Sequence, residues 1–261
     1  MKALPPRLAR RLRFRAELHV PFVAGRTRIG WLRPELAARL AAWPNVFQTG
    51  AQTVRLLDSE ALDRVVEQLA QEGFIPGWRN ERYRIADLFD IERAAARPFG
   101  LTTRAAHVNG IVAGEKMWLA RRSNTKATDP GMLDNMVGGG VSAGLSIEEV
   151  LLKEAWEEAG IPTELAQRAT LAGSIEVMRE VPQGVACEVA HVYDLDLPPG
   201  FLPVNQDGEV SEFTLVSFDE VRRLIEETDE LAADAALVAL DCLNRRSARP
   251  GSASAAAGRA T

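Results

Sequence analysis

The feature that most restricts the fold of this chain is a group of three glutamates on one expected helix, preceded by a run of glycines. The segment KEAWEEAG over residues 153–160 predicts a helix, and at about 100° per residue Glu154, Glu157 and Glu158 share one of its faces. Like charges at this spacing repel each other by roughly 0.2–0.5 kcal/mol per pair on an exposed helix. A divalent cation would neutralise them, and Mg²⁺ is bound by a few carboxylates together with substrate phosphates. The pattern therefore indicates metal-assisted phosphate chemistry.

Both ends of this helix are marked in the sequence. Ser146 suits the N-cap position, and Glu149 three residues later completes a capping box. Gly160 suits the left-handed position just past the helix, and Pro162 prevents its continuation. Taken alone, the acidic face would be interpreted as a solvated surface, because acidic helix faces are common. The glycine-rich turn expected at residues 138–140 shifts the interpretation toward a phosphate site.

The stretch GGVSAGLSIEEVLLKEAWEEAGI over residues 139–161 resembles the Nudix box, a loop–helix–loop signature of hydrolases that act on a diphosphate linked to another moiety. The matching positions are Gly139, Lys153-Glu154 in place of an Arg-Glu pair, Ala155, Glu157-Glu158, Gly160 and Ile161. Two positions depart from the pattern. Leu145 stands where the box has its first glutamate, and Lys153 keeps the charge of the usual arginine but loses its planar fork.

The resemblance implies a metal centre and part of the catalytic machinery. It assigns Glu154, Glu157 and Glu158 as the main ligands of Mg²⁺ or Mn²⁺, with Gly139 adding a backbone carbonyl. Metal ions neutralise phosphate oxygens and lower the pKa of a bound water, so Glu157 and Glu158 are expected to be catalytic. Glu209, in a loop after the box, is a candidate general base, although a solvated turn explains it equally well.

A second resemblance extends from about residue 10 to about residue 240. The segments WRNERY, HVNG, PGMLDN and DGEV look like a Nudix subgroup with an N-terminal domain of uncharacterised function; they lie at residues 78–83, 107–110, 130–135 and 207–210. This subgroup is related to Nudix proteins that some eukaryotes fuse to thiamine pyrophosphokinase. The resemblance implies a metal-dependent diphosphatase that releases a monophosphate and phosphate. Its expected substrates are thiamine diphosphate, damaged analogues of it, or nucleoside diphosphates such as 8-oxo-dGDP.

Basic residues in front of the box are expected to bind the substrate phosphates. Arg121, Arg122 and Lys126 lie at and just beyond the end of an expected strand. Neighbouring side chains on a strand point to opposite faces, so at most one of the two arginines faces the site directly. Surface ion pairing is the competing explanation for these basic residues.

Two further sets of side chains are weaker candidates. His107 and Asn109 lie two residues apart on an expected strand and therefore on the same side of it, although a lone histidine is usually structural. Trp78, Phe99 and Trp118 could stack on a planar base or a thiazolium ring, but buried aromatic residues usually belong to the core.

The order of expected elements fits an α/β (α+β) protein with two domains. Residues 1–98 are expected to form a small mixed α/β accessory domain, residues 99–245 the Nudix domain, and residues 246–261 a disordered tail. The accessory domain should hold strands at 17–23 and 28–32 and helices at 33–42 and 59–72. The Nudix domain should be an α/β/α sandwich with a mixed sheet, with strands at 105–112, 116–122, 171–178, 186–195 and 211–216 and closing helices from about 218 and at 229–245.

Composition sets further limits. The 261 residues carry a net charge of −5 and are 46% hydrophobic, which is ordinary for a globular protein. No apolar run approaches the ~20 residues needed to span a bilayer, so we expect no membrane partner and a cytoplasmic location. Cys187 and Cys242 are expected to be buried fillers. The basic segment at 1–33 has no aromatic-interleaved groove, so the expected partner is a small-molecule diphosphate and not nucleic acid. We leave a homodimer open.

Two other functions stay open on the same scaffold. An enzyme like isoprenoid diphosphate isomerase needs a protonating residue beside an alkene, and Cys187 has no evident partner for that role. A non-catalytic Nudix-fold sensor would bind its ligand without hydrolysing it. Sensors commonly lose the acidic helix residues, whereas all three are present here. The sequence therefore favours the hydrolase.

Overall fold

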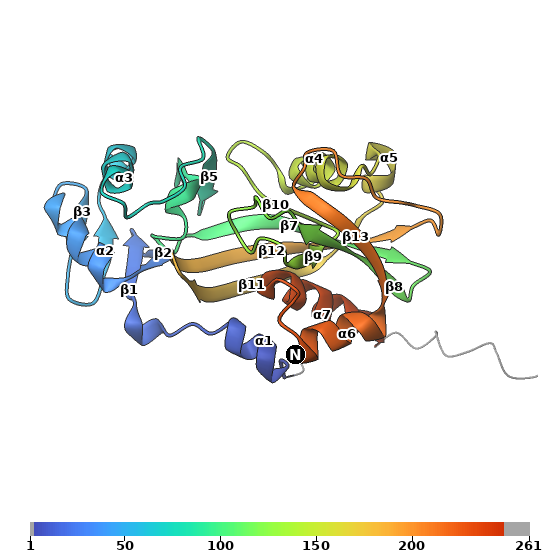
Figure 1. Cartoon of the computed structure of the whole chain (residues 1–261). Coiled ribbons are helices and arrows are strands. Elements are labelled where there is room, and N and C mark those ends of the chain that lie inside the picture. The colour runs from blue at the N-terminus through green and yellow to red at the C-terminus, as the bar shows by residue number, and fades with distance from the viewer. Residues whose placement is uncertain (1–2, 248–261) are drawn as a thin grey trace, which may run out of the picture.

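The computed structural model describes residues 3–247, which form a small N-terminal sheet beside a larger sheet with helices on both faces (Figure 1). The N-terminal part holds a four-stranded sheet in the order β2-β1-β4-β3 and a separate hairpin of β5 and β6. Its elements are α1 (Pro6–Arg11), β1 (Val20–Ala24), β2 (Thr27–Leu32), α2 (Pro34–Arg39), β3 (Phe47–Thr49), β4 (Val54–Leu56), α3 (Leu62–Gln71), β5 (Arg82–Ile85) and β6 (Phe89–Glu92). The two strands and two helices expected here are present, but the first strand begins at Val20 and not at residue 17, because Ala16–Leu18 forms a short 3-10 helix.

One apolar core holds this N-terminal part together, and it extends from Phe22 on β1 to Leu101. The face of helix α3 that packs into this core is made of Leu62, Val65, Val66 and Leu69. These residues follow the i, i+3, i+4, i+7 spacing of an amphipathic helix, which is why the sequence alone predicted the element.

The larger sheet has seven strands and is mixed. Its main path runs β11-β12-β7-β8-β13, while β10 pairs with β7 and β9 with β8. Strands β7 and β12 are parallel, and the other pairs are antiparallel. The strands are β7 (Thr102–Val112), β8 (Lys116–Arg122), β9 (Leu133–Asn135), β10 (Val137–Gly140), β11 (Thr170–Val181), β12 (Gly184–Leu197) and β13 (Val210–Ser217). All five strands expected here are present.

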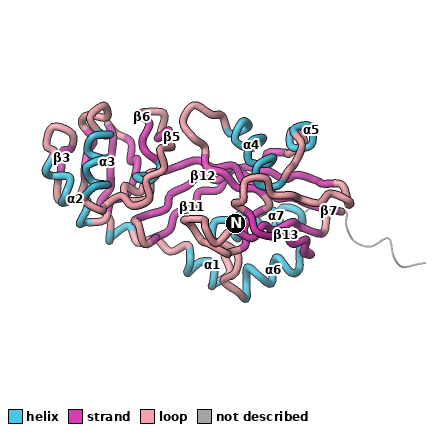
Figure 2. Tube along the Cα trace, turned by 45° about the horizontal axis from the view of Figure 1, so that its top comes forward, coloured by secondary structure: helices cyan, strands magenta, loops and turns pink. Residues whose placement is uncertain are grey.

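Helices cover both faces of this sheet. Helices α4 (Ile147–Ala159) and α5 (Thr163–Ala166) lie on one face, and α6 (Phe218–Glu227) and α7 (Ala233–Ser247) lie on the other (Figures 1 and 2). Along β8, Trp118 packs into the core under α4, whereas Met117 and Leu119 pack into the core under α6 and α7. Alternating side chains therefore fill two layers. The predicted α/β/α sandwich is confirmed.

Helix α1 packs against the C-terminal helices. Leu8 is buried in the core formed by α6 and α7, and Arg11 Nη2 donates to the carbonyl of Leu231 at 2.7 Å. Figure 1 shows this helix, in blue, beside the red α6. Helix α1 is thus fixed to the helices on the larger sheet, and the domain boundary at residue 98 stays a prediction.

The glycine run Gly138–Gly140 is not the turn expected from the sequence. It forms most of β10, which pairs antiparallel with β7. The glycines are needed for close approach, because a side chain at Gly139 would overlap with Glu154 and one at Gly140 would overlap with the Tyr83 hydroxyl. Local sequence suggested a turn because glycine is typical of turns, whereas the contacts that require glycine here come from distant segments.

Two smaller expectations also need correction. Helix α7 begins at Ala233 and not at residue 229, because Leu231 forms a bridge with Leu133 and the Ala232 N–H donates to the Leu133 carbonyl at 2.7 Å. Of the expected tail, residues 246–247 belong to α7, and residues 248–261 lie outside the described residues.

Candidate active site

Helix α4 begins and ends where the sequence predicted. The Ser146 N–H donates to Glu149 Oε2 at 2.8 Å and the Glu149 N–H donates to Ser146 Oγ at 3.1 Å, so the capping box is complete. Gly160 ends the helix with a φ of 62°. The helix is therefore fixed at both ends, and it presents its acidic side chains next to β10.

Glu154 and Glu158 lie against this strand. The Gly138 N–H donates to Glu158 Oε2 at 2.8 Å, and the Glu154 side chain packs over Gly139. Glu158 is only 5% exposed, which is unusual for a glutamate. Because Gly138 and Gly139 of β10 have no side chains, both carboxylates can approach the backbone of this strand.

Burial raises the pKa of Glu158 to about 7. The Lys126 ammonium and the Gly138 N–H act in the opposite direction, whereas Glu154 and Asp134 add negative charge nearby and raise the pKa further. A carboxylate this deeply buried is costly unless a cation compensates its charge. A divalent ion at this position would supply that compensation and keep Glu158 ionised.

Glu157, the third acid of the helix face, is held by Lys153. The Lys153 Nζ lies 2.6 Å from Glu157 Oε2 and 3.1 Å from Glu154 Oε1. Within residues 3–247, no group of three Asp, Glu, His or Cys side chains is arranged to hold a metal ion as it stands. The chemistry of the donor set nevertheless fits one, because the Glu154 and Glu158 carboxylates of α4 lie against the β10 backbone at Gly138 and Gly139, and Mg²⁺ prefers hard oxygen ligands.

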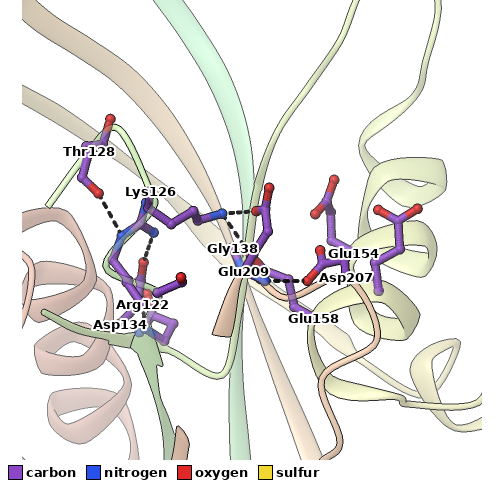
Figure 3. Close-up of polar contacts among 12 residues, drawn as sticks. Arg122, Lys126, Thr128, Asp134, Gly138, Glu154, Glu158, Asp207 and Glu209 are labelled. Carbon is purple, nitrogen blue, oxygen red and sulfur yellow. Dashed lines mark hydrogen bonds and ion pairs between the residues drawn. The ribbon is translucent and has the colours of Figure 1, made fainter. Parts of the chain in front are cut away.

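Lys126 connects the acidic helix with Glu209. Its ammonium pairs with Glu209 and lies 3.6 Å from Glu158 Oε1, and Figure 3 shows the lysine reaching toward Glu209. The Glu209 carbonyl accepts from the Ser123 N–H at 2.8 Å, and Asp207 Oδ1 accepts from the Glu209 N–H at 2.8 Å. The structure therefore brings Glu209 to the acidic helix from a loop that follows the box by about 50 residues.

The two neighbouring arginines separate as strand alternation predicts. Arg122 lines the cavity described below, where its Nη1 donates to Asp134 Oδ2 at 2.6 Å and its Nε to the Thr128 carbonyl at 2.9 Å. Arg121 does not line this cavity, and its Nη1 donates to the Gly131 carbonyl at 2.9 Å. Of the pair, only Arg122 lines the cavity.

A cavity of about 330 Å³ lies beside β10. Its walls come from β7, β10 and β12, from the loop at 126–129, and from segments 76–83 and 93–97 of the N-terminal part. Both parts of the chain therefore contribute to one cavity. Its volume is in the range of sites for small organic ligands.

His107 is a buried charged residue in the cavity wall. Its Nδ1 lies 3.0 Å from Asn135 Oδ1, and its Nε2 lies 3.2 Å from Glu188 Oε1. Burial alone would lower the pKa of His107, but the hydrogen bond and charge of Glu188 outweigh burial and raise the pKa to about 9. At neutral pH both ring nitrogens therefore donate. The sequence predicts that His107 lies on the same side of its strand as Asn109. It could not predict the two hydrogen-bond partners of His107, because they come from other strands.

The aromatic residues considered for ring stacking do not reach the cavity. Phe99 is buried in the N-terminal core, Trp118 lies in the core under α4, and Trp78 Nε1 donates to Asn80 Oδ1 at 2.9 Å. Tyr83 is the one aromatic residue in the cavity wall within residues 3–247. The geometry therefore does not favour ring stacking on these three residues.

Both cysteines are buried, as expected. Burial raises the pKa of the Cys187 thiol and of the Cys242 thiol to about 12. Both thiols are therefore protonated at neutral pH, which is typical of inert structural cysteines.

Comparison with known families decides the class of protein. The model of the NUDIX domain matches residues 103–238. The chain belongs to the Nudix family of hydrolases. A second model, a domain of unknown function (DUF4743), matches residues 7–103. The Nudix domain and the enzyme class predicted from the box are thereby confirmed.

Several relatives match over most of this Nudix chain. Nudix hydrolase 24, chloroplastic, of Arabidopsis thaliana is 37% identical over 245 residues, covering 87% of this chain and 67% of that protein. Nudix hydrolase 20, chloroplastic, of the same plant is 34% identical over 252 residues with the same two coverages. An uncharacterized protein of Saccharomyces cerevisiae is 33% identical over 216 residues, covering 72% of this chain and 63% of that protein. The chain thus spans about two thirds of the length of these relatives.

Solved structures are more distant. The MutT protein from Methanosarcina mazei is 21% identical with a TM-score of 0.45, covering 57% of this chain and 96% of that chain. The MutT NUDIX hydrolase from Burkholderia pseudomallei is 20% identical with a TM-score of 0.43, covering 54% of this chain and 97% of that chain. Separately, no helix within residues 3–247 is long and apolar enough to span a bilayer.

Proposed function

We propose that this Nudix protein is a metal-dependent diphosphatase that cleaves a small organic or nucleoside diphosphate to the monophosphate and phosphate. The supporting observation is the contact between opposite charges beside the cavity, where Lys126 Nζ lies 3.6 Å from the buried Glu158. Hydrolysis of a phosphoanhydride requires neutralised phosphate oxygens and a positioned water. Carboxylates that can bind a cation therefore lie next to a lysine that can bind phosphate oxygens.

The acidic helix supplies the metal ligands in this proposal. Glu154, Glu157 and Glu158 would hold Mg²⁺ or Mn²⁺ together with the Gly139 carbonyl, and Glu157 would exchange its present partner Lys153 for the ion. A bound ion neutralises phosphate oxygens and lowers the pKa of a coordinated water. Glu157 and Glu158 are catalytic in this sense, because their charge fixes the ion next to the reacting phosphate.

The remaining steps belong to side chains on neighbouring strands and loops. Lys126 and Arg122 bind phosphate oxygens, and Asp134 orients Arg122 through the 2.6 Å ion pair. Glu209 is the proposed general base, and its pairing with Lys126 keeps it beside the acidic helix. Arg121 has no part in this proposal, because it lies outside the cavity wall.

For the substrate, we propose thiamine diphosphate or an oxidised analogue, with oxidised nucleoside diphosphates such as 8-oxo-dGDP as the second class. The resemblance to the subgroup associated with thiamine pyrophosphokinase supports the first class, and the cavity of about 330 Å³ is compatible with either. A cytoplasmic location is a further part of the proposal, whereas the names of two relatives contain the word chloroplastic; a homodimer stays open.

A phosphate-release screen tests the proposed activity. The purified chain is incubated with Mg²⁺ or Mn²⁺ and thiamine diphosphate, its oxidised analogues or 8-oxo-dGDP, each of which releases inorganic phosphate when it is hydrolysed to the monophosphate. We expect metal-dependent phosphate release from at least one diphosphate, abolished by EDTA and reduced at least about 100-fold in Glu158→Gln. Glu148→Gln, an exposed residue of the same helix, is the matched control and should keep wild-type turnover. The proposal is contradicted if no diphosphate is hydrolysed, or if Glu158→Gln keeps full turnover.

A further inference from the structure

One wall of the cavity comes from the N-terminal part of the chain, which matches a domain of unknown function. Segments 76–83 and 93–97 supply this wall. Figure 2 shows β5 and β6 of the same part lying between the N-terminal sheet and α4. A role for this part therefore has to be sought at the cavity itself.

The basic side chains of the cavity wall differ in whether they have a partner. Besides His107, which lies 3.2 Å from Glu188, they are Arg79, Arg93, Arg97, Arg122 and Lys126. Arg93 pairs with a glutamate at 2.6 Å, Arg122 pairs with an aspartate at 2.6 Å, and Lys126 pairs with two glutamates. Among residues 3–247, Arg97 has no ion pair within 4.0 Å and its guanidinium makes no hydrogen bond, although it is partly buried. Arg79 has no side-chain partner either, but it is exposed to solvent.

Two carboxylates whose charge acts on Arg97 are paired with another arginine, Arg179. Arg179 Nε donates to Asp234 Oδ1 at 2.9 Å, and Arg179 Nη2 donates to Asp129 Oδ2 at 3.1 Å. Burial lowers the pKa of Arg97, and the charge of Arg179 lowers it further, against the weaker opposing effect of Asp234, Asp129 and Glu188. A guanidinium in this position still carries its charge. Leaving such a charge partly buried without a partner costs free energy, and a bound anion would recover it.

The backbone of Arg97 is held in place by the larger sheet. Its carbonyl accepts from the Val185 N–H and from the Gly100 N–H, both at 3.0 Å. The approach to β12 requires Gly184, because a side chain there would overlap with the Arg97 carbonyl oxygen. The hairpin of β5 and β6 is also tied to the loop before α4, where Ser142 Oγ donates to Glu81 Oε1 at 2.6 Å. The backbone of Arg97 therefore has a fixed position beside the cavity.

We propose that Arg97 binds a phosphoryl oxyanion of the ligand in this cavity, so that the N-terminal part of the chain takes a direct share in substrate recognition. The inference rests on the proposed function in one respect, namely that the cavity accepts a phosphorylated ligand. The oxyanion belongs either to the second phosphoryl group of an intact diphosphate or to a single released phosphate. A guanidinium suits both, because its planar fork donates two hydrogen bonds to one phosphoryl group.

Binding of inorganic pyrophosphate and of inorganic phosphate, measured by calorimetry in EDTA, tests this role. We expect Arg97→Ala and Arg97→Gln to weaken pyrophosphate binding about tenfold or more, and Arg97→Lys to stay within about threefold of the wild type. Arg26→Ala removes an exposed arginine from the turn between β1 and β2 and should change nothing. Because Arg97 has no partner to lose and its charge is partly buried, its variants should unfold at or above the wild-type thermal midpoint, which separates lost binding from lost folding.

The two ligands identify which group Arg97 binds. An equal loss for phosphate and pyrophosphate assigns Arg97 to a single phosphate, and a loss confined to pyrophosphate assigns it to the second phosphoryl group. Pyrophosphate affinity of Arg97→Ala within about twofold of the wild type overturns the inference, and so does a wild-type protein that binds no pyrophosphate. Since these titrations involve neither metal nor turnover, their outcome is separate from that of the phosphate-release screen.

Discussion

At the scale of single residues, the site is defined by charges that are held close together. Lys126 contacts both Glu158 of the acidic helix and Glu209 of the loop before β13, whereas Arg121, only five residues earlier, makes contacts outside the cavity. Sequence alone could name these basic residues but could not rank them. Strand alternation separates Arg121 from Arg122 without saying which of them faces the ligand.

This difference predicts unequal effects of two matched substitutions. Lys126→Met should raise the KM for a hydrolysed diphosphate about tenfold or more, because it removes a charged contact to a phosphate. Arg121→Met should leave the KM within about twofold, because this side chain does not line the cavity. Steady-state kinetics of both variants with the same diphosphate checks the pair. An equal rise in both would return Arg121 to the site.

His107 predicts a dependence of stability on pH. Its pKa is raised from 6.5 to about 9 in the folded chain, so the folded state holds the proton more tightly than the unfolded state. The stabilisation is fully present below about pH 6.5 and is lost as the pH rises through about 9. We expect the free energy of unfolding to fall by on the order of 2–3 kcal/mol across this window, and Glu188→Gln to flatten the fall. Urea unfolding at both ends of the window measures it, and an unchanged slope in Glu188→Gln would refute this role of Glu188.

At the scale of elements, the position of β10 against α4 decides where the carboxylates lie. The absence of a side chain at Gly139 lets Glu154 pack over the strand. Gly139→Ala should therefore lower turnover roughly tenfold or more by displacing Glu154, with a smaller effect on folding. Gly200→Ala is the control, because a Cβ there meets nothing within 4 Å. Turnover and thermal unfolding of both variants are compared, and normal turnover in Gly139→Ala would show that Glu154 does not need its present position.

The elements also show what local sequence can and cannot reveal. Helix α4 was predictable because its capping box and its terminal glycine are local signals, and both are present in the structure. The run Gly138–Gly140 was misread because its reason lies in Glu154 and Tyr83, which approach from other segments. The partners of His107 were missed for the same cause, since Glu188 is 81 positions away. Local patterns therefore predicted the helices and strands, whereas the contacts between distant segments were seen only in the structure.

At the scale of the whole molecule, the two regions that match the family models line one shared cavity. Segments from both sides of residue 103 line it, and α1 at the start of the chain packs on α6 and α7 at its end. Neither contact could be deduced from composition or periodicity, because each joins segments that are distant in the sequence. The resemblance gave the family, whereas the shared cavity needed the structure.

The packing of α1 predicts a global effect on stability. Leu8 is 1% exposed in the core of α6 and α7, so Leu8→Ala should reduce the free energy of unfolding by about 2–4 kcal/mol. Leu18→Ala is the matched control, because Leu18 is 47% exposed and its loss should cost less than about 0.5 kcal/mol. Chemical denaturation of both variants checks the difference. Equal small losses would show that α1 is not part of the cooperative core.

Titration with Mn²⁺, followed by electron paramagnetic resonance, addresses the metal centre most directly. The wild-type chain should bind Mn²⁺, and Glu154→Gln and Glu158→Gln should each weaken the affinity about tenfold or more, whereas Glu148→Gln on the same helix should not. If all four proteins bind Mn²⁺ equally well, or if none binds it, the acidic face of α4 is not a metal site.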